Sequence, residues 1–191
     1  MPIPRSSNRT RFLVRATGVA AAALCAAVPA LAQATGCEPL FAAQTKLWET
    51  PHHAFVIDSS GTEKALRGGK PTSMELVLVG GVLYVQYNGK WSKSPMGAEM
   101  MKKQEAENIK NSKSNCAFVR NETMNGESAA LYTMHSVNES STSDGQIWIS
   151  KSRGLLLRSA ATIDIGDGES GKRRTVTNYD YSHVQKPAGV P

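Results

Sequence analysis

Short apolar runs separated by glycine-containing turns dominate the pattern of the chain. The densest example spans residues 74–91, where runs of β-branched and aromatic residues flank Gly80-Gly81 and a third run follows Asn88-Gly89. Gly-Gly and Asn-Gly pairs accept positive φ at both centres of a tight hairpin turn, whose twist matches that of the flanking strands. The pattern therefore predicts a three-stranded antiparallel meander, around which we expect the rest of the chain to be organised.

Two stretches have helical periodicity instead. Within residues 39–49 apolar positions recur at spacings of three, four and seven, and Pro51 ends the pattern. Ser94-Pro95 is typical of a helix start, because serine accepts bonds from the free amides of the first turn and proline has no N–H to satisfy there. A helix over residues 96–113 follows. Its thin apolar stripe predicts a helix that packs on the rest of the protein through a narrow face and exposes most of its surface to solvent.

After the second helix the pattern returns to short strands. Asn125-Gly126 is another hairpin turn, and a short turn ending at Gly154 separates two further apolar runs. About eight antiparallel strands with two helices and no βαβ unit predict an α+β fold. Besides a first strand at 52–58 and the meander, strands are expected at 117–122, 128–137, 146–150, 155–158, 160–165 and 174–184, with a surface loop at 138–144 and an extended tail at 186–191.

Both faces of the predicted meander are apolar. Met74, Leu76 and Leu78 fall on one face, and Val77 and Val79 on the other. A sheet that is solvated on one face should alternate cleanly between apolar and polar residues. These strands should therefore be covered on both sides, or covered on one side and lining an apolar hollow on the other. The pattern leaves both interpretations open.

Residues 1–34 have the pattern of a secretory signal peptide. Four arginines lie before or at the start of an apolar, alanine-rich run that ends in small residues. The run is shorter than the ~20 residues that span a membrane. We therefore expect cleavage of this leader and a single mature domain over residues 35–191, with a retained N-terminal anchor as the alternative.

Removal of the leader changes the charge balance. The full chain has 22 basic and 16 acidic residues. Four of the basic residues lie in the leader, so the mature chain carries a balance of only +2. This weakens any electrostatic case for binding nucleic acid or anionic lipid, and no nucleic acid partner is expected.

The mature chain keeps two cysteines, Cys37 and Cys116. In an oxidising compartment the simplest interpretation is one disulfide between them. Closing a loop of this length would stabilise the fold by roughly 4 to 5 kcal/mol on the chain-entropy model. Lipidation of Cys37 with a free Cys116, or two separate thiols, are the alternatives. A zinc site is less suited to this pair, because no Cys-x-x-Cys supplies adjacent ligands.

Two segments carry a resemblance to a known family. These are Ile147-Trp-Ile-Ser-Lys-Ser-Arg-Gly-Leu-Leu-Leu-Arg158 and Asn178-Tyr-Asp-Tyr-Ser-His-Val-Gln-Lys-Pro187. Together with the order of helix, strand, meander, Ser-Pro helix and second meander, they resemble the LolA-like periplasmic lipoprotein-carrier superfamily. The resemblance implies a strongly curved antiparallel sheet, an unclosed half-barrel, with two helices capping its concave face. It also implies a periplasmic location and an apolar ligand held in the hollow. No individual binding residue is carried over from the family.

Candidate chemistry is sparse. His52 and His53 are consecutive on a strand and point to opposite faces, so they would not chelate one ion, and we interpret them as a solvated strand start. His135 and His183 lie on separate predicted strands, and nothing in the sequence brings them together. The acidic residues at 164–169 lack the spacing of a calcium loop. No catalytic motif occurs. We therefore expect neither an enzyme, a metal site nor a cofactor, and interpret the basic residues 172–174 as a solvated sheet edge.

The resulting hypothesis is a periplasmic binding or carrier protein for an apolar ligand, such as a lipid or a lipoprotein acyl chain. Binding would remove hydrocarbon from water, between the curved sheet and the helices. If the assignment of residues to the two faces is wrong by one position, the residues of the other face line the site instead. The expected lining residues are Met74, Leu76, Leu78, Leu83, Val85, Tyr87, Met100, Met101, Trp148 and Leu157.

The alternative hypothesis is an envelope protein-interaction module. It would have the same fold with a filled core, and a transient protein partner would dock on an exposed strand edge.

Overall fold

A computed structural model describes residues 36–59, 72–87, 89–166 and 171–190. These residues belong to one of the two compact units into which the chain divides, Gln33–Pro191. The expected signal peptide, Asn88 of the predicted Asn-Gly turn and most of the glycine-rich turn before residue 171 lie outside the described residues.

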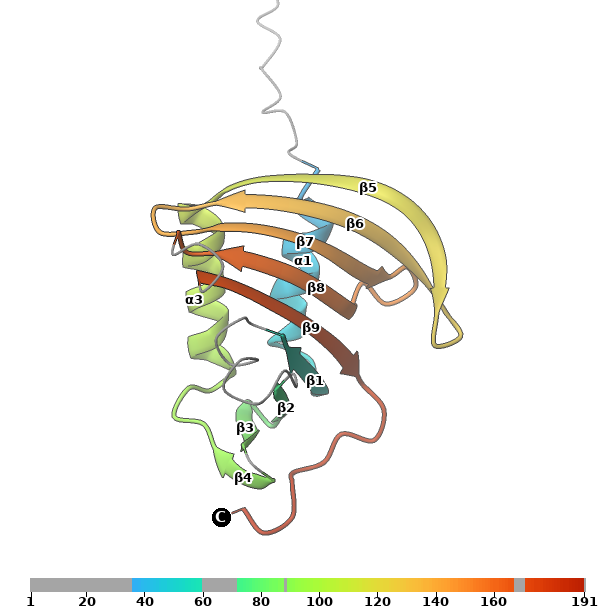
Figure 1. Cartoon of the computed structure of the whole chain (residues 1–191). Coiled ribbons are helices and arrows are strands. Elements are labelled where there is room, and N and C mark those ends of the chain that lie inside the picture. The colour runs from blue at the N-terminus through green and yellow to red at the C-terminus, as the bar shows by residue number, and fades with distance from the viewer. Residues whose placement is uncertain (1–35, 60–71, 88, 167–170, 191) are drawn as a thin grey trace, which may run out of the picture. The chain divides into compact units, whose positions relative to one another are not determined.

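The described part of the chain forms one sheet of nine antiparallel strands in the order β4-β3-β2-β1-β9-β8-β7-β6-β5, with two α-helices on it (Figure 1). The predicted α+β fold with an unclosed curved sheet is confirmed. The elements are α1 (Glu38–Leu47), β1 (His52–Asp58), β2 (Thr72–Val79), β3 (Val82–Tyr87), β4 (Lys90–Lys93), α3 (Ala98–Asn111), β5 (Lys113–Met124), β6 (Glu127–Val137), β7 (Thr142–Ser150), β8 (Leu156–Asp164) and β9 (Lys172–Asp180).

The hairpins have the local cause that the sequence predicts. Gly80 and Gly81 have φ values of 59° and 74° and join β2 to β3, and Asn125 and Gly126 have 50° and 79° and join β5 to β6. Glycine adopts positive φ without steric cost, and asparagine tolerates it. The predicted meander therefore forms. However, its strands β2 to β4 lie at one end of the sheet and not at its centre.

The first and last strands of the described chain are neighbours. β1 pairs with β9 in a register that places His53 opposite Asp180 and Asp58 opposite Thr175. This pairing joins the meander to the strands β5 to β8. The basic residues 172–174 therefore lie on an interior strand, and their interpretation as a sheet edge is wrong. Arg173 instead forms an ion pair with Asp58 of β1, at 3.2 Å.

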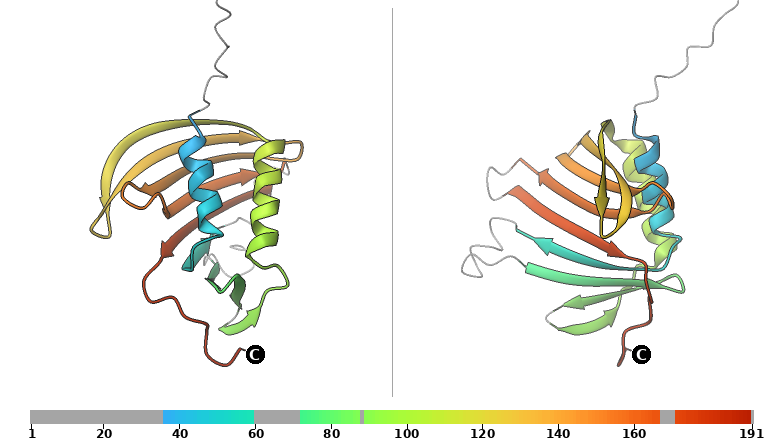
Figure 2. Two further views of the ribbon diagram at one scale, coloured as in Figure 1. Left: turned by 180° about the vertical axis from the view of Figure 1, so that it is seen from behind. Right: turned by 90° about the vertical axis from the view of Figure 1, so that its right-hand side faces the viewer.

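Both helices lie on one face of the sheet, which we call the inner face (Figure 2). The core between α1 and this face contains Leu40, Leu47, Ile147, Ile149 and Leu156. Residues of the opposite parity point to what we call the outer face. The two faces are thus distinguished by which side chains meet the helices, because successive strand residues alternate between faces.

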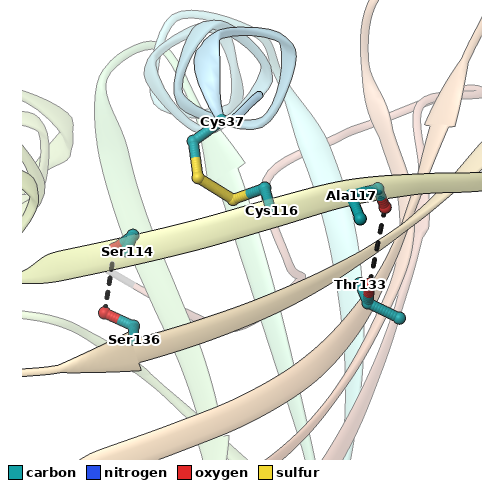
Figure 3. Close-up of a disulfide and its surroundings, with 6 residues drawn as sticks. All are labelled: Cys37, Ser114, Cys116, Ala117, Thr133 and Ser136. Carbon is teal, nitrogen blue, oxygen red and sulfur yellow. Dashed lines mark hydrogen bonds between the residues drawn. A yellow bond between two sulfur atoms is a disulfide. The ribbon is translucent and has the colours of Figure 1, made fainter. Parts of the chain in front are cut away.

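The predicted disulfide joins α1 to the end strand β5. Cys37 precedes the first turn of α1, and its sulfur is bonded to that of Cys116, with 5.0 Å between the Cα atoms (Figure 3). A Cβ on Gly36 would lie 2.7 Å from the carbonyl oxygen of Cys116, and the φ of Gly36 is +71°. Only glycine fits that approach of the chain to β5. Because the sulfur of Cys37 is bonded to Cys116, it cannot also carry a lipid, which is the alternative considered above.

The second helix begins later than the sequence predicts. Ser94 does accept a hydrogen bond from the Met96 amide, at 3.1 Å, but α3 starts at Ala98, with Gly97 as its N-cap. The Ala98 amide donates to the Gly81 carbonyl of the β2–β3 turn, at 3.0 Å. The chain therefore bends at Ser94, and α3 begins only where Ala98 contacts the β2–β3 turn.

The end of the chain is also more structured than expected. β9 ends at Asp180, and the tail that follows covers the outer face of the meander, where Val184 and Val190 pack with Val77 and Tyr84. This explains why both faces of the meander are apolar: α3 lies on one and the tail on the other. A second difference lies in the loop predicted at 138–144, because β7 already begins at Thr142.

Candidate functional site

The apolar wall beneath α3 is built from β2 and β3. Leu78 and Leu83 are opposite each other in the strand register and are buried together with Ala98 of α3. Four partly buried side chains pack against this cluster, namely Leu76, Val85, Met101 and Trp48. Five of the ten residues expected to line the ligand site, Leu76, Leu78, Leu83, Val85 and Met101, are therefore brought together on the inner face.

The other five expected residues are not in this cluster. Met74 is partly buried on β2, whereas Tyr87 and Met100 are 57% and 55% exposed. Trp148 and Leu157 form a separate cluster with Leu131 and Ala129.

Trp148 and Leu157 lie on the outer face for two different reasons. Trp148 alternates with Ile147 and Ile149, which both face α1. On β8 the register shifts, since Trp148 pairs with Arg158 while Ile149 pairs with Leu156. The extra residue, Leu157, forms a bulge that breaks the alternation of the strand.

The space between the helices and the sheet is nearly filled. A cavity of about 80 Å³ remains, bounded by α1, α3, β5 and β6. Its apolar lining is Phe41, Ile109 and Met134, and the rest is polar, including Gln44 and Glu105. The side-chain oxygen Oε1 of Gln44 is buried there and has no hydrogen-bond partner among the residues that the structure describes. This space is well below the about 300 Å³ of the smaller ligand pockets in proteins.

Two ionisable groups on the inner face are shifted by burial. Burial raises the pKa of the Glu105 carboxyl on α3. It also raises the pKa of the Tyr179 hydroxyl on β9, which hydrogen bonds with Ser159 and Thr177 partly offset. In both cases desolvation penalises the charged form. Beside the apolar wall there are therefore two ionisable groups whose charged forms burial disfavours.

His52 is part of this interior, and the interpretation of a solvated strand start is wrong for it. It is 2% exposed and lies among the rings of Trp48, Tyr179 and Tyr181. Its burial lowers the pKa of the imidazole. His53 points to the opposite face, as strand alternation predicts, and its imidazole is hydrogen-bonded to Glu75, at 3.0 Å.

The remaining histidines are apart. His135 on β6 bonds to Asp144 of β7, at 2.8 Å, and His183 lies in the tail, where it lines a small hollow together with His53 and Trp91. Within the part of the chain that the structure describes, no group of three metal-ligating side chains gathers. A search of the same residues finds no helix long and apolar enough to cross a membrane.

A larger hollow, which nothing in the sequence indicated, lies on the outer face near the β5–β6 hairpin. Its volume is about 490 Å³. Phe55, Leu157 and Asn178 contribute from β1, β8 and β9, and Met124 from the end of β5. Arg153 of the β7–β8 turn and Asp180 at the end of β9 add charged groups. Because these residues come from five segments of the chain, no local motif could have indicated the hollow.

Comparison with known proteins adds little to this description. No family model and no curated protein matches the chain. Among solved structures, it is similar to the crystal structure of LprF from Mycobacterium bovis, with 10% sequence identity and a TM-score of 0.40, over 80% of this chain and 94% of that chain. A similarity of this size carries no inference about ligand or activity.

Proposed function

We propose that the protein is a periplasmic binding or carrier protein that holds the apolar part of a lipid or acyl chain between the inner face of the sheet and α3. The observation that supports this proposal is the weak attachment of α3 over an apolar wall. Among its fourteen residues only Ala98 is buried, yet the wall beneath it contains Leu76, Leu78, Leu83 and Val85. A helix with so few buried side chains is held mainly by its ends and by scattered contacts.

The guest enters by displacing α3. The cavity of about 80 Å³ is too small for an acyl chain, so the guest takes the contacts that the helix now makes. Burying ten methylene groups contributes about 8 kcal/mol. In exchange, α3 gives up the packing of Ala98 and Met101, the hydrogen bond from the Ala98 amide to Gly81, and a surface ion pair between Lys102 and Glu49. Exposed ion pairs of this kind contribute little.

The first test is binding of the fluorescent probe 1-N-phenylnaphthylamine to the domain of residues 35–191, followed by displacement with myristate. We expect saturable, displaceable fluorescence. Met101→Glu places a carboxylate against the wall and should weaken probe binding by about tenfold or more, because an unpaired charge in an apolar site is costly.

The matched control is Gln104→Glu, which adds the same charge to the same helix at an exposed position. It should bind the probe as the wild type does. Absence of saturable binding, or equal affinity of the Met101→Glu and Gln104→Glu variants, would contradict the proposal. A further variant, Phe55→Ala, separates the two faces, since it alters only the outer hollow. Extraction of the native protein and mass spectrometry of the extract then identify the guest.

A second candidate function is a protein-interaction module, which the filled inner space and the end strand β5 favour. Among the described strands β5 pairs with β6 alone, and its Phe118 is 54% exposed and Val119 44% exposed. Such an edge presents unpaired backbone groups to another chain.

A photo-crosslinking residue at Asn121 on β5, with Lys103 on α3 as the comparison site, tests this second function in the cell envelope. Recovery of a specific polypeptide from the β5 position alone supports it, and recovery from neither position excludes a partner at this edge.

A further inference from the structure

The outer hollow has the dimensions of a ligand site. Its volume of about 490 Å³ lies within the range of about 300 to 1,000 Å³ that is usual for such sites. Phe55, Asn178 and Leu157 line it from the outer face of the sheet, and Met124 lines it from the β5–β6 hairpin. This hairpin extends beyond the part of the sheet that the helices cover (Figures 1 and 2). The hollow is therefore separate from the inner wall considered above.

One wall of the hollow is fixed by an ion pair. Arg153 donates from Nε to Glu127, at 2.9 Å, and from Nη2 to the other oxygen of the same carboxylate. Glu127 also accepts bonds from the hydroxyls of Ser150 and Ser152. The guanidinium lies over the ring of Tyr181, 5.2 Å from its centroid. Bidentate pairs of this kind have a defined geometry, so this wall is formed before any ligand arrives.

The floor of the hollow is apolar. Leu157 belongs to the outer cluster that also contains Trp148 and Leu131, and Met124 of the hairpin packs against the same cluster. Phe55 of β1 adds an aromatic ring that is 39% exposed. These side chains offer a surface for hydrocarbon or an aromatic ring.

The charges that line the hollow leave one anionic group. Glu127 and Arg153 neutralise each other. Asp180 accepts hydrogen bonds from the amide and the hydroxyl of Ser182, at 2.8 and 2.6 Å, and forms no ion pair within the described residues. These bonds from Ser182, with His53 and His183 nearby, hold the pKa of this carboxyl below its ordinary value.

The anionic and aromatic groups are within reach of one small molecule. Phe55 pairs with Asn178 in the register of β1 and β9, and Asp180 is two residues further along β9 on the same face. Such diagonal neighbours are about 7 to 8 Å apart. An aromatic or aliphatic body of a few carbons with a terminal charge spans this distance.

We propose that the outer hollow binds a small organic cation, with its apolar body against Phe55 and Leu157 and its ammonium group paired with Asp180. An anion is disfavoured, because the guanidinium of Arg153 is already engaged at both oxygens of Glu127, and the remaining carboxylate repels negative charge. A cation also interacts favourably with the face of an aromatic ring.

The test compares three probes that share one body: 4-phenylbutylamine, 4-phenylbutanol and 4-phenylbutyrate. Each is titrated into the ¹⁵N-labelled domain of residues 35–191 at pH 7.5, and affinities are taken from amide shifts. We expect the amine to bind about fivefold or more tightly than the alcohol, and the carboxylate most weakly. The shifts should centre on residues 153–157 and 178–182. Added salt should reduce the preference for the amine, because Asp180 is exposed.

Two variants with matched controls locate the contacts. Asp180→Asn keeps an acceptor for Ser182 and should bring the amine to the affinity of the alcohol, whereas Asp144→Asn, at another exposed aspartate, should change nothing. Phe55→Ala should weaken all three probes, whereas Phe118→Ala, at an exposed ring on β5, should not. Equal affinities for the three probes, no binding, or shifts confined to the inner face would each overturn the proposal.

Discussion

The two helices lie on the same face of the sheet but contribute differently to the fold (Figure 2). α1 has ten residues, buries Leu40, Ala43 and Leu47, and is tied to β5 by a disulfide. α3 has fourteen residues and buries only Ala98. The shorter helix is therefore part of the core, and the longer one is a cover. Helix length is a poor guide to structural importance when the apolar face is narrow.

The largest expected effect is loss of the disulfide, which would make α1 more like α3. The Cys37→Ser/Cys116→Ser variant should lose roughly 4 to 5 kcal/mol of unfolding free energy, because the bond closes a long loop in the unfolded chain. The cysteines are 79 positions apart. Urea unfolding measures this loss, and reduced wild-type protein is the control. A loss of less than about 1 kcal/mol would mean that the noncovalent packing of α1 suffices.

The next effect compares the buried Leu40 of α1 with the exposed Met100 of α3. Leu40→Ala in α1 should cost about 3 kcal/mol, since Leu40 is fully buried and truncation leaves a cavity. Met100→Ala in α3 should cost less than about 0.5 kcal/mol, as an exposed side chain. The same urea experiment measures both. Similar losses for the two variants would show that α3 is as firmly packed as α1.

A smaller effect concerns the turn that supports α1. Lys46 of α1 donates to the carbonyl oxygen of Arg153, and the ion pair with Arg153, helped by Ser150 and Ser152, lowers the pKa of Glu127 from 4.5 to about 2. A depressed carboxyl pKa stabilises the fold above pH 4.5, and this stabilisation is lost as the pH falls toward 2.

Glu127→Gln should therefore lose about 1 to 2 kcal/mol at pH 7, less than the full shift implies because solvent screens the pair. At pH 2 the variant and the wild type should converge. Unfolding measured at both pH values checks the sign, and a constant difference between the two proteins would contradict it.

The smallest effect has the opposite sign and belongs to α3. Burial raises the pKa of Glu105, so the attached helix binds a proton more readily than the detached one. Attachment is favoured at low pH and weakens as the pH rises through the raised pKa. Amide exchange in α3, corrected for intrinsic rates, should therefore be slower relative to α1 at pH 5 than at pH 7, by less than about tenfold.

Glu105→Gln should remove this pH dependence, while Glu99→Gln, at an exposed position of the same helix, should keep it. If the ratio of amide exchange in α3 to that in α1 is the same at pH 5 and pH 7, then Glu105 does not control the attachment of the helix.

Features with a local cause could be predicted from the sequence. The Gly80-Gly81 and Asn125-Gly126 turns form where predicted, because two adjacent residues determine the turn. The disulfide could be predicted because only two cysteines lie outside the expected leader. The helices were found by their periodicity, although Ser94 proved to precede α3 by a short turn.

Features that depend on distant pairing could not be predicted. The position of the meander at one end of the sheet follows from the pairing of β1 with β9, which no local pattern encodes. The bulge on β8 places Leu157 in the outer cluster beside Trp148, because one extra residue shifts the register. The sequence suggested that His52 is solvated, because it is a polar residue at the start of a strand. Its burial depends on the rings of Tyr179 and Tyr181, which are distant in the sequence.

The adjacency of β1 and β9 also governs the order of events during biosynthesis. Strand β1 has its register partner near position 180, so it must wait for almost the entire polypeptide to emerge before both of its edges are occupied. Until then β1 and β8 each expose a hydrogen-bonding edge to other nascent chains, and closing so long a loop is slow. A chain stopped before Lys172 should aggregate rather than remain as a shortened, soluble domain, and chaperones that protect emerging polypeptides should matter most for this last step of folding.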